Sequence, residues 1–563
     1  MIATRNAPGR RRSNLFRCTP GTALTPARTP PWRRRLAATL AACTALSSLS
    51  APALAQVRLP SLGETASKDL SVGAERRLGE QIMREARRDP AYFDDPVLLE
   101  YLQSIWDPLV AAARQLGNID ADTDQAFAWE PFLVRDRSVN AFALPGGFVG
   151  VHLGLIAITA TADQFASVLA HEMSHVTQRH IARSIAPQQQ ASMLAIATLL
   201  LGIIAASRSN NVDLANAAMM GGQGAAIQSQ LNFSREMERE ADRIGFGVLA
   251  GAGYAPSGMA AMFERLDAAT RLNDSGGFPY LRSHPLTVDR ISEARNRTLL
   301  TNSAPALPTL QHALMQARSR VLMAEGAQSL QRLSGGTSSP LLADQVAALY
   351  AGGMAASLLN DHARAESQAA EAVQLASTAG AREPRAQRTL KLLQAQVRLA
   401  RGDAPAAMQA LESLLASATD RPAMLLRAQA ALELQRREPG AAATPLRTST
   451  EALQTWLAER PHDAEGWELL SATAEALGLK LRSMRAAAEA RAVLGDLGGA
   501  IDRLRAAQAV VRSDAGQDFI EGSVIDTRLR QLMATRRQLA LDARGENRRP
   551  GPGDEPPQQA DRP

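Results

Sequence analysis

The strand signals of this chain stop near Leu300, and this change of pattern constrains its fold more than any other feature. Between about Ala74 and Arg297, helical and strand patterns alternate, whereas Ala-rich amphipathic helices continue from there to about Leu541. Ala, Leu and Arg are strong helix formers, and aromatic residues make up only 4% of the chain. We therefore predict an α+β, mainly α protein, in which a helical domain with a small β-sheet precedes an all-α domain.

Three segments of the helical half share one pattern, in which an Asp is followed by an Ala four residues later. They begin at Asp361, Asp403 and Asp496, and each follows one helix and opens the next. This helix–turn–helix pattern resembles tetratricopeptide repeats of irregular length, with a non-repetitive helical bundle as the alternative. We predict a tetratricopeptide-like helical repeat domain at 301–543. Residues 544–563 are rich in Pro, Gly and charge, which predicts a disordered tail.

The first 55 residues have the pattern of a signal peptide. Three Arg, at positions 33 to 35, precede an apolar run that ends in Ala53-Leu54-Ala55, an A-x-A cleavage site. We predict a signal peptide at residues 1–55 and a mature protein in the bacterial periplasm. An uncleaved membrane anchor is one alternative. A lipid anchor at Cys43 is another, because the residues around it resemble a lipoprotein cleavage box.

Charge and cysteine content narrow the function classes. Residues 1–55 hold nine Arg and no Lys, Asp or Glu, so the net charge of +6 leaves −3 for the remainder. A basic surface for nucleic acid is therefore not expected. Both cysteines, Cys18 and Cys43, lie in this first segment. The mature chain would thus need no disulfide in an oxidising compartment.

A predicted hairpin lies directly before a predicted helix. Phe127–Val134 is a short apolar run that suits a strand, and Val139–Val151 is typical of two strands around a Pro-Gly-Gly turn. The helix that follows has Thr161 or Asp163 as its N-cap residue.

This helix carries the sequence His171-Glu172-Met173-Ser174-His175. Histidines four residues apart project from one face of a helix, so both rings can bind one zinc ion. Glu172 can then reach a zinc-bound water and act as the general base. The motif also occurs by chance in helices, but here it follows a strand and a glycine turn in a chain predicted to be exported.

Catalytic zinc needs a third protein ligand and an open fourth position. Position 181 is Ile and not His, which excludes the metzincin pattern. His180 is half a helical turn out of phase with His171, so we expect it on the surface or in packing contacts.

Several carboxylates that could supply the third ligand follow in Glu236–Gly245, and Glu238 and Asp242 share a helical face. One can bind zinc and the other can orient a histidine; spacing alone does not say which Glu binds, and a solvated charged face is the alternative.

These motifs resemble the gluzincin family of the CAAX prenyl protease and the membrane protease HtpX. The resemblance makes Glu238 the third zinc ligand, places Asp242 in the catalytic site, and implies one zinc per chain. The segments at 140–143, 170–180, 240–245 and 284–286 are more similar to the BepA-like periplasmic proteases. We therefore predict a zinc metallopeptidase domain at 56–300.

Resemblance to the BepA-like proteases also implies that His284 occupies the open zinc position and keeps the enzyme latent. A loop histidine without metal contact is the alternative.

Substrate contacts are predicted at two places. Arg290 could stabilise the oxyanion of an attacked peptide carbonyl. The strand that begins with Asn140, Ala141 and Phe142 could bind an extended peptide by strand addition. The apolar segment Ala191–Ser207 is too short for a comfortable membrane span and is expected to be a lid or core helix, with membrane insertion as the alternative.

The resulting hypothesis is a periplasmic, latent zinc endopeptidase. Resemblance to the BepA-like proteases implies a role in outer-membrane protein assembly and quality control, with unfolded or misassembled outer-membrane proteins and the barrel-assembly machinery as partners. The hypothesis also includes chaperone activity and peripheral contact of the protein with the membrane. The alternative is a non-proteolytic periplasmic chaperone or scaffold that uses the repeat domain to bind its partners.

Overall fold

The computed structural model describes residues 70–184, 234–272, 277–301, 306–335, 339–378, 383–415, 420–513 and 518–547. The predicted signal peptide, Cys43 and the apolar segment Ala191–Ser207 lie outside these ranges. The predicted tail is described only as far as Asn547, where the last helix ends. Among the described residues, no helix has the length and apolar character needed to cross a membrane.

A four-stranded sheet with the order β1-β2-β4-β3 lies in the N-terminal half. Its strands are β1 (Tyr92–Phe93), β2 (Glu130–Val134), β3 (Ala141–Leu144) and β4 (Phe148–His152). β3 and β4 form the predicted hairpin, whose turn places Gly146 and Gly147 at φ values of +77° and +89°, a region that favours glycine. β2 pairs with β4 in parallel, and this pairing and β1 were not predicted.

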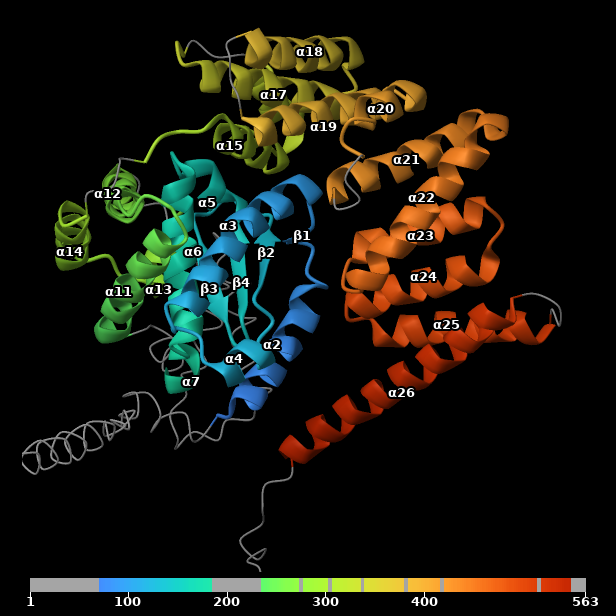
Figure 1. Cartoon of the computed structure of the whole chain (residues 1–563), viewed down its shortest axis with the longest axis horizontal. Helices are drawn as coiled ribbons and strands as arrows, with labels where there is room; N and C mark the ends of the chain where they lie inside the picture. The colour runs from blue at the N-terminus through green and yellow to red at the C-terminus, as the bar shows by residue number, and fades with distance from the viewer. Residues whose placement is uncertain are drawn as a thin grey trace, which may run out of the picture. The chain divides into compact units, whose positions relative to one another are not determined.

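Helices cover both faces of the sheet (Figure 1). On one face, α2 (Val72–Ala86) packs against alternate residues of the strands, among them Phe132 and Phe148. On the other, α3 (Pro96–Gln115) and α6 (Ala162–Thr177) pack against Leu133 and Val149. The two-residue period of a strand produces this division.

Helix α6 follows the hairpin after a short helix, α5 (Leu153–Ile158). The Thr161 side chain accepts a hydrogen bond from the Gln164 amide at 3.2 Å, so Thr161 and not Asp163 is the N-cap residue. Helices α11 (Arg235–Gly251) and α12 (Ser257–Leu272) pack against α6. Gly245 permits the close approach of α11, since a Cβ there would lie 3.1 Å from the Ala170 backbone.

Only helices occur among the described residues after α6, as the sequence predicts for the region beyond Leu300. Asp361, Asp403 and Asp496 accept hydrogen bonds from amides in the first turns of α18 (His362–Thr378), α20 (Ala404–Leu411) and α25 (Leu497–Ser513). The Ala four residues after each of these Asp residues is fully buried between packed helices, which confirms the helix–turn–helix prediction. Two further helices of the N-terminal half are α4 (Ala121–Ala126) and α7 (His180–Ser184). The helices described after α12 are α13 (Tyr280–Ser283), α14 (Val288–Leu299), α15 (Leu310–Leu322), α16 (Gly326–Leu333), α17 (Leu342–Leu358), α18 (His362–Thr378), α19 (Pro384–Ala400), α20 (Ala404–Leu411), α21 (Arg421–Arg437), α22 (Pro439–Glu459), α23 (Ala464–Ala476), α24 (Lys480–Val493), α25 (Leu497–Ser513) and α26 (Phe519–Asn547).

Ion pairs join the start of α3 to the helices of the C-terminal half. Arg318 of α15 pairs with Asp95 at 2.7 Å, and both side chains are buried. Arg421 of α21 contacts Asp94 at 2.8 Å. The helices of the C-terminal half are thus anchored directly to the half of the chain that contains the sheet.

Candidate active site

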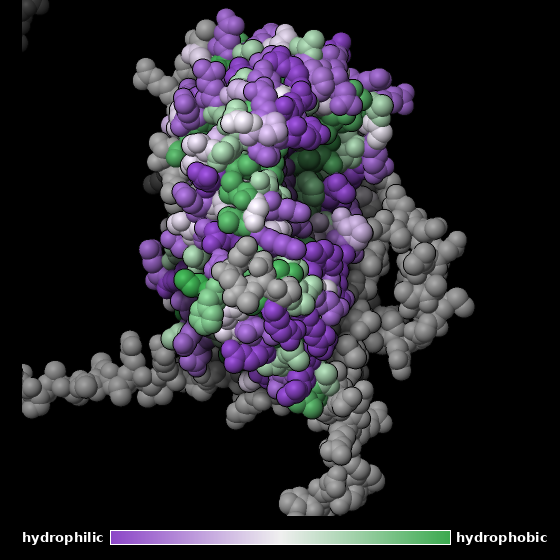
Figure 2. Space-filling view, turned by 90° about the vertical axis from the view of Figure 1, so that its right-hand side faces the viewer, coloured by the Kyte–Doolittle hydropathy of each residue, from purple (hydrophilic) through white to green (hydrophobic). Residues whose placement is uncertain are grey.

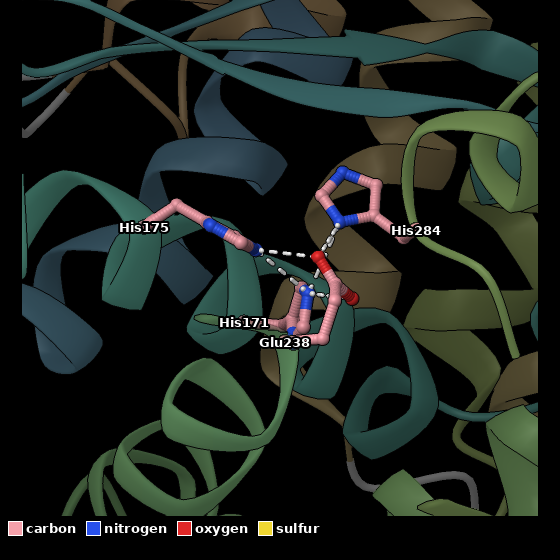
Figure 3. Close-up of side chains that lie close together, drawn as sticks. All are labelled: His171, His175, Glu238 and His284. Atoms are coloured by element: carbon pink, nitrogen blue, oxygen red, sulfur yellow. Dashed lines mark hydrogen bonds and ion pairs between the residues drawn. The ribbon is translucent and has the colours of Figure 1, made fainter. Parts of the chain in front are cut away.

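Four side chains from three segments converge between α6, α11 and the end of α13 (Figure 3). His171 and His175 come from α6, Glu238 from α11, and His284 follows α13, and all four are buried. Their ligand atoms all lie within 4.8 Å of one another. The two Nε2 atoms of His171 and His175 are 3.0 Å apart, and His284 Nδ1 lies 2.9 Å from Glu238 Oε1.

This donor set fits zinc. Tetrahedral zinc with bonds of about 2.0–2.2 Å holds its donor atoms roughly 3.3–3.5 Å apart. Glu238 Oε1 lies 3.4 Å from His175 Nε2, and Glu238 Oε2 lies 3.5 Å from His171 Nε2; both distances are close to that spacing. Three histidines and one carboxylate are also ligand types that zinc prefers.

Buried carboxylates give the site a strong preference for positive charge. Burial opposes protonation of His171, but its hydrogen bonds to Asp242 and Glu238 raise its pKa to about 10. Burial by itself would raise the pKa of Glu238, yet nearby His284 and His171 lower it overall. A divalent cation satisfies the same carboxylates when it displaces the proton from His171.

Arg290 holds the carboxylates of the site in place. Its Nε and Nη2 bind both oxygens of Asp242 at 2.7 and 2.8 Å, and its Nη1 lies 2.7 Å from Glu238 Oε2. Asp242 in turn lies 2.9 Å from His171 Nδ1 and so orients that ring. Arg290 is only 4% exposed. Its guanidinium is therefore engaged with the ligand network, while the predicted oxyanion contact stays a prediction.

Glu172 lies between the metal cluster and the edge strand β3. Its Oε2 accepts a hydrogen bond from the Ala143 amide at 3.1 Å, and its Oε1 is 3.6 Å from His284 Nε2. Burial raises the pKa of Glu172 above its ordinary value. A carboxylate with a raised pKa at this position suits a general base.

Tyr280, which was not predicted, belongs to the same cluster. Its ring stacks on His284 with centroids 4.7 Å apart. Burial raises the pKa of Glu172, and the Tyr280 side chain opposes that shift. No spacing rule pointed to it, because it lies four residues before His284 on a helix of a single turn.

Of the residues predicted to bind substrate, Ala141 and Phe142 lie in the edge strand β3, and Asn140 directly precedes it. The Asn140 carbonyl accepts a hydrogen bond from the His152 amide, and β3 then pairs with β4. The alternation of an antiparallel ladder leaves the backbone groups of Ala141 and Ala143 facing the free edge. The Phe142 ring lies against Phe132 and His152, on the face of the sheet that α2 covers, whereas the metal cluster lies on the α6 side.

A two-histidine helix, a carboxylate from a second helix and a buried Glu beside the edge strand of the sheet define a metallopeptidase. Comparison with known proteins agrees: residues 101–298 match peptidase family M48. A beta-barrel assembly-enhancing protease of Yersinia pestis is 31% identical over 85% of this chain and 92% of its own length. That of Escherichia coli K12 is 34% identical over 47% of this chain, a match that spans about half of the relative. A mitochondrial metalloendopeptidase of Saccharomyces cerevisiae is 30% identical over 34% of this chain and 53% of its own length. The chain therefore belongs to peptidase family M48, together with the beta-barrel assembly-enhancing proteases.

Proposed function

We propose that this metallopeptidase is a latent zinc endopeptidase of the periplasm that degrades misassembled outer-membrane β-barrel proteins. The observation that carries the proposal is the convergence of four ligand atoms within 4.8 Å beside Glu172 and the edge of β3. His171, His175 and Glu238 would hold the zinc. When bound, zinc supplies a Lewis acid that lowers the pKa of water to about 7.

The residues of this chain have separate tasks in hydrolysis. The edge of β3 that does not pair with β4 would align an extended peptide antiparallel to β3. Glu172 would take a proton from the attacking water and pass it to the leaving amine. Asp242 and Arg290 keep His171 and Glu238 in their orientations through the contacts given above. Arg290 would also stabilise the negative charge that develops on the attacked carbonyl.

His284 provides the latency. Zinc active in hydrolysis keeps one position open, and the His284 ring lies where a fourth ligand would lie. It must leave before a substrate carbonyl can enter. Because His284 follows the single turn of α13, movement of Tyr280–Ser283 would carry it away.

Substrates and location follow from the relatives and the repeat helices. The printed name of the Yersinia pestis relative supports β-barrel assembly as the process. Helical repeats offer extended surfaces for partner proteins. On the face that Figure 2 turns toward the viewer, hydrophobic residues lie in a hollow among hydrophilic ones, which suits unfolded segments of outer-membrane proteins or the barrel-assembly machinery.

The test is zinc content and casein hydrolysis of the full-length chain, with Glu172→Gln and His284→Ala beside it. We expect one zinc per chain, slow cleavage by the unsubstituted protein, none by Glu172→Gln and faster cleavage by His284→Ala. Bound zinc without cleavage in any variant would favour the non-proteolytic chaperone. Absence of bound zinc would overturn the proposal.

A further inference from the structure

The helical path of the chain is interrupted directly after the metal-binding helix. Helix α6 ends at Thr177, and Arg179 has a φ of +51°, which is unusual for a residue with a side chain. The Arg179 guanidinium holds this conformation through the buried Glu75 at 2.7 Å. As a result α7 begins at His180 with a new helical phase, and His180 faces back toward His175 although a continuous helix would have turned it away.

His180 links His175 to a carboxylate. Its Nδ1 lies 2.8 Å from His175 Nδ1, and its Nε2 lies 3.1 Å from Glu240 Oε2. Arg183 pairs with the same Glu240 oxygen at 2.9 Å. The His180 ring is fully buried, so this chain of contacts runs from the protein edge at Glu240 to the metal cluster.

The contacts determine where the protons lie. A carboxylate accepts hydrogen bonds, so His180 Nε2 carries the hydrogen that points to Glu240. The lone pair of His180 Nδ1 is then free to accept the hydrogen of His175 Nδ1. In this tautomer His175 presents the lone pair of Nε2 to the cluster, where that atom lies 3.0 Å from His171 Nε2.

We propose that His180 is a positioning residue that holds His175 in the tautomer and orientation needed to bind zinc, with Glu240 and Arg183 fixing His180. The two ligands of α6 thus have different supports. The charged carboxylate of Asp242 contacts His171 directly and orients it. The neutral imidazole of His180 orients His175, and the Glu240 carboxylate lies beyond the His180 ring, without direct contact to the zinc ligand.

This inference rests on the proposed zinc site, and its test measures zinc affinity by competition with a chromophoric chelator. In the full-length chain, His180→Leu should lower the affinity about 10–100-fold. His180→Asn should recover part of the loss, because its Oδ1 can accept the His175 hydrogen. The half-exposed Glu240 can be replaced with less effect on folding, and Glu240→Ala should lower the affinity by a smaller factor.

His312 provides the matched control. It is as buried as His180 and hydrogen-bonds the Thr159 carbonyl, far from the cluster in sequence and outside its contacts. His312→Leu should leave zinc affinity unchanged. Unchanged affinity in His180→Leu and Glu240→Ala, or an equal loss in His312→Leu, would overturn the inference. Failure of the unsubstituted chain to bind zinc would overturn the proposed function as well, so the two failures are distinguishable.

Discussion

Around the metal cluster, residues 171–175, 238–242 and 284–290 meet from distant parts of the sequence in a buried network of charges. In the helices of the C-terminal half, a recurring stabilising feature is local: a capping Asp at the start of a helix and a buried Ala one turn later. Removing one member of a buried charge network leaves its partners unpaired. Removing a cap or a small packing residue affects one helix pair. The two regions should therefore differ strongly in the cost of single substitutions.

Arg290→Met should have the largest effect. It leaves Asp242 and Glu238 buried without their cation and should lower the free energy of unfolding of the zinc-free chain by about 3–5 kcal/mol. Denaturant unfolding measures this change. Arg295→Met on the same helix is the control, since its exposed pair with Glu264 should contribute less than about 1 kcal/mol. Equal losses for both variants would contradict the contrast between the regions.

Ala365→Leu should have an intermediate effect. Ala365 is fully buried where α17 and α18 pack, and the added methylene groups should cost about 1–3 kcal/mol. Ala363, exposed on the same helix, provides the control: Ala363→Leu should change the unfolding free energy little. If both variants unfold like the unsubstituted chain, the small residue is not required for helix packing.

The same contrast explains what the sequence could predict. The hairpin, the helix with both histidines and the capping Asp residues follow from local rules, and the structure confirms them. The parallel pairing of β2 with β4 joins separate segments, so no local pattern reports it. β1 has only two residues, too few for a period.

In the site, spacing identified the two histidines on one helical face and a second helical face with two carboxylates. Spacing could not show which of the Glu residues is the metal ligand. Glu238 as a ligand came from the resemblance, and it lies in the cluster. His180 was expected on the surface or in packing contacts. It is buried and contacts His175 because α6 ends before it, a break that helical phase alone could not reveal. Arg290 was expected near the reaction, and its pairing with Asp242 required the fold.

Asp403→Ala should cost about 1 kcal/mol, the usual contribution of an N-cap. The Asp403 side chain accepts a hydrogen bond from the Ala406 amide at 3.1 Å at the start of α20. Asp403→Asn keeps this acceptor and should retain most of the stability. Denaturant unfolding compares the three proteins, and an Asn variant as unstable as the Ala variant would show that the cap is not the cause.

Glu465→Gln tests the place where the two kinds of region meet. Glu465 of α23 lies 3.6 Å from Arg421, which also binds Asp94 next to α3. Burial and the neighbouring Asp94 raise the pKa of Glu465 to about 8. The folded chain therefore keeps this proton while the unfolded chain loses it near its ordinary pKa, so stability falls as pH rises from about 4.5 to 8.

Gln cannot ionise, so the variant should lack this decline. Its Tm relative to that of the unsubstituted chain should be higher at pH 9 than at pH 5, by thermal unfolding at both values. Glu468→Gln, at an exposed position of the same helix, should show no such change with pH. If the Tm difference of Glu465→Gln is the same at both pH values, Glu465 is ionised in the folded protein through this range. The junction would then be a solvated ion pair, unlike the buried charge network of the metal site.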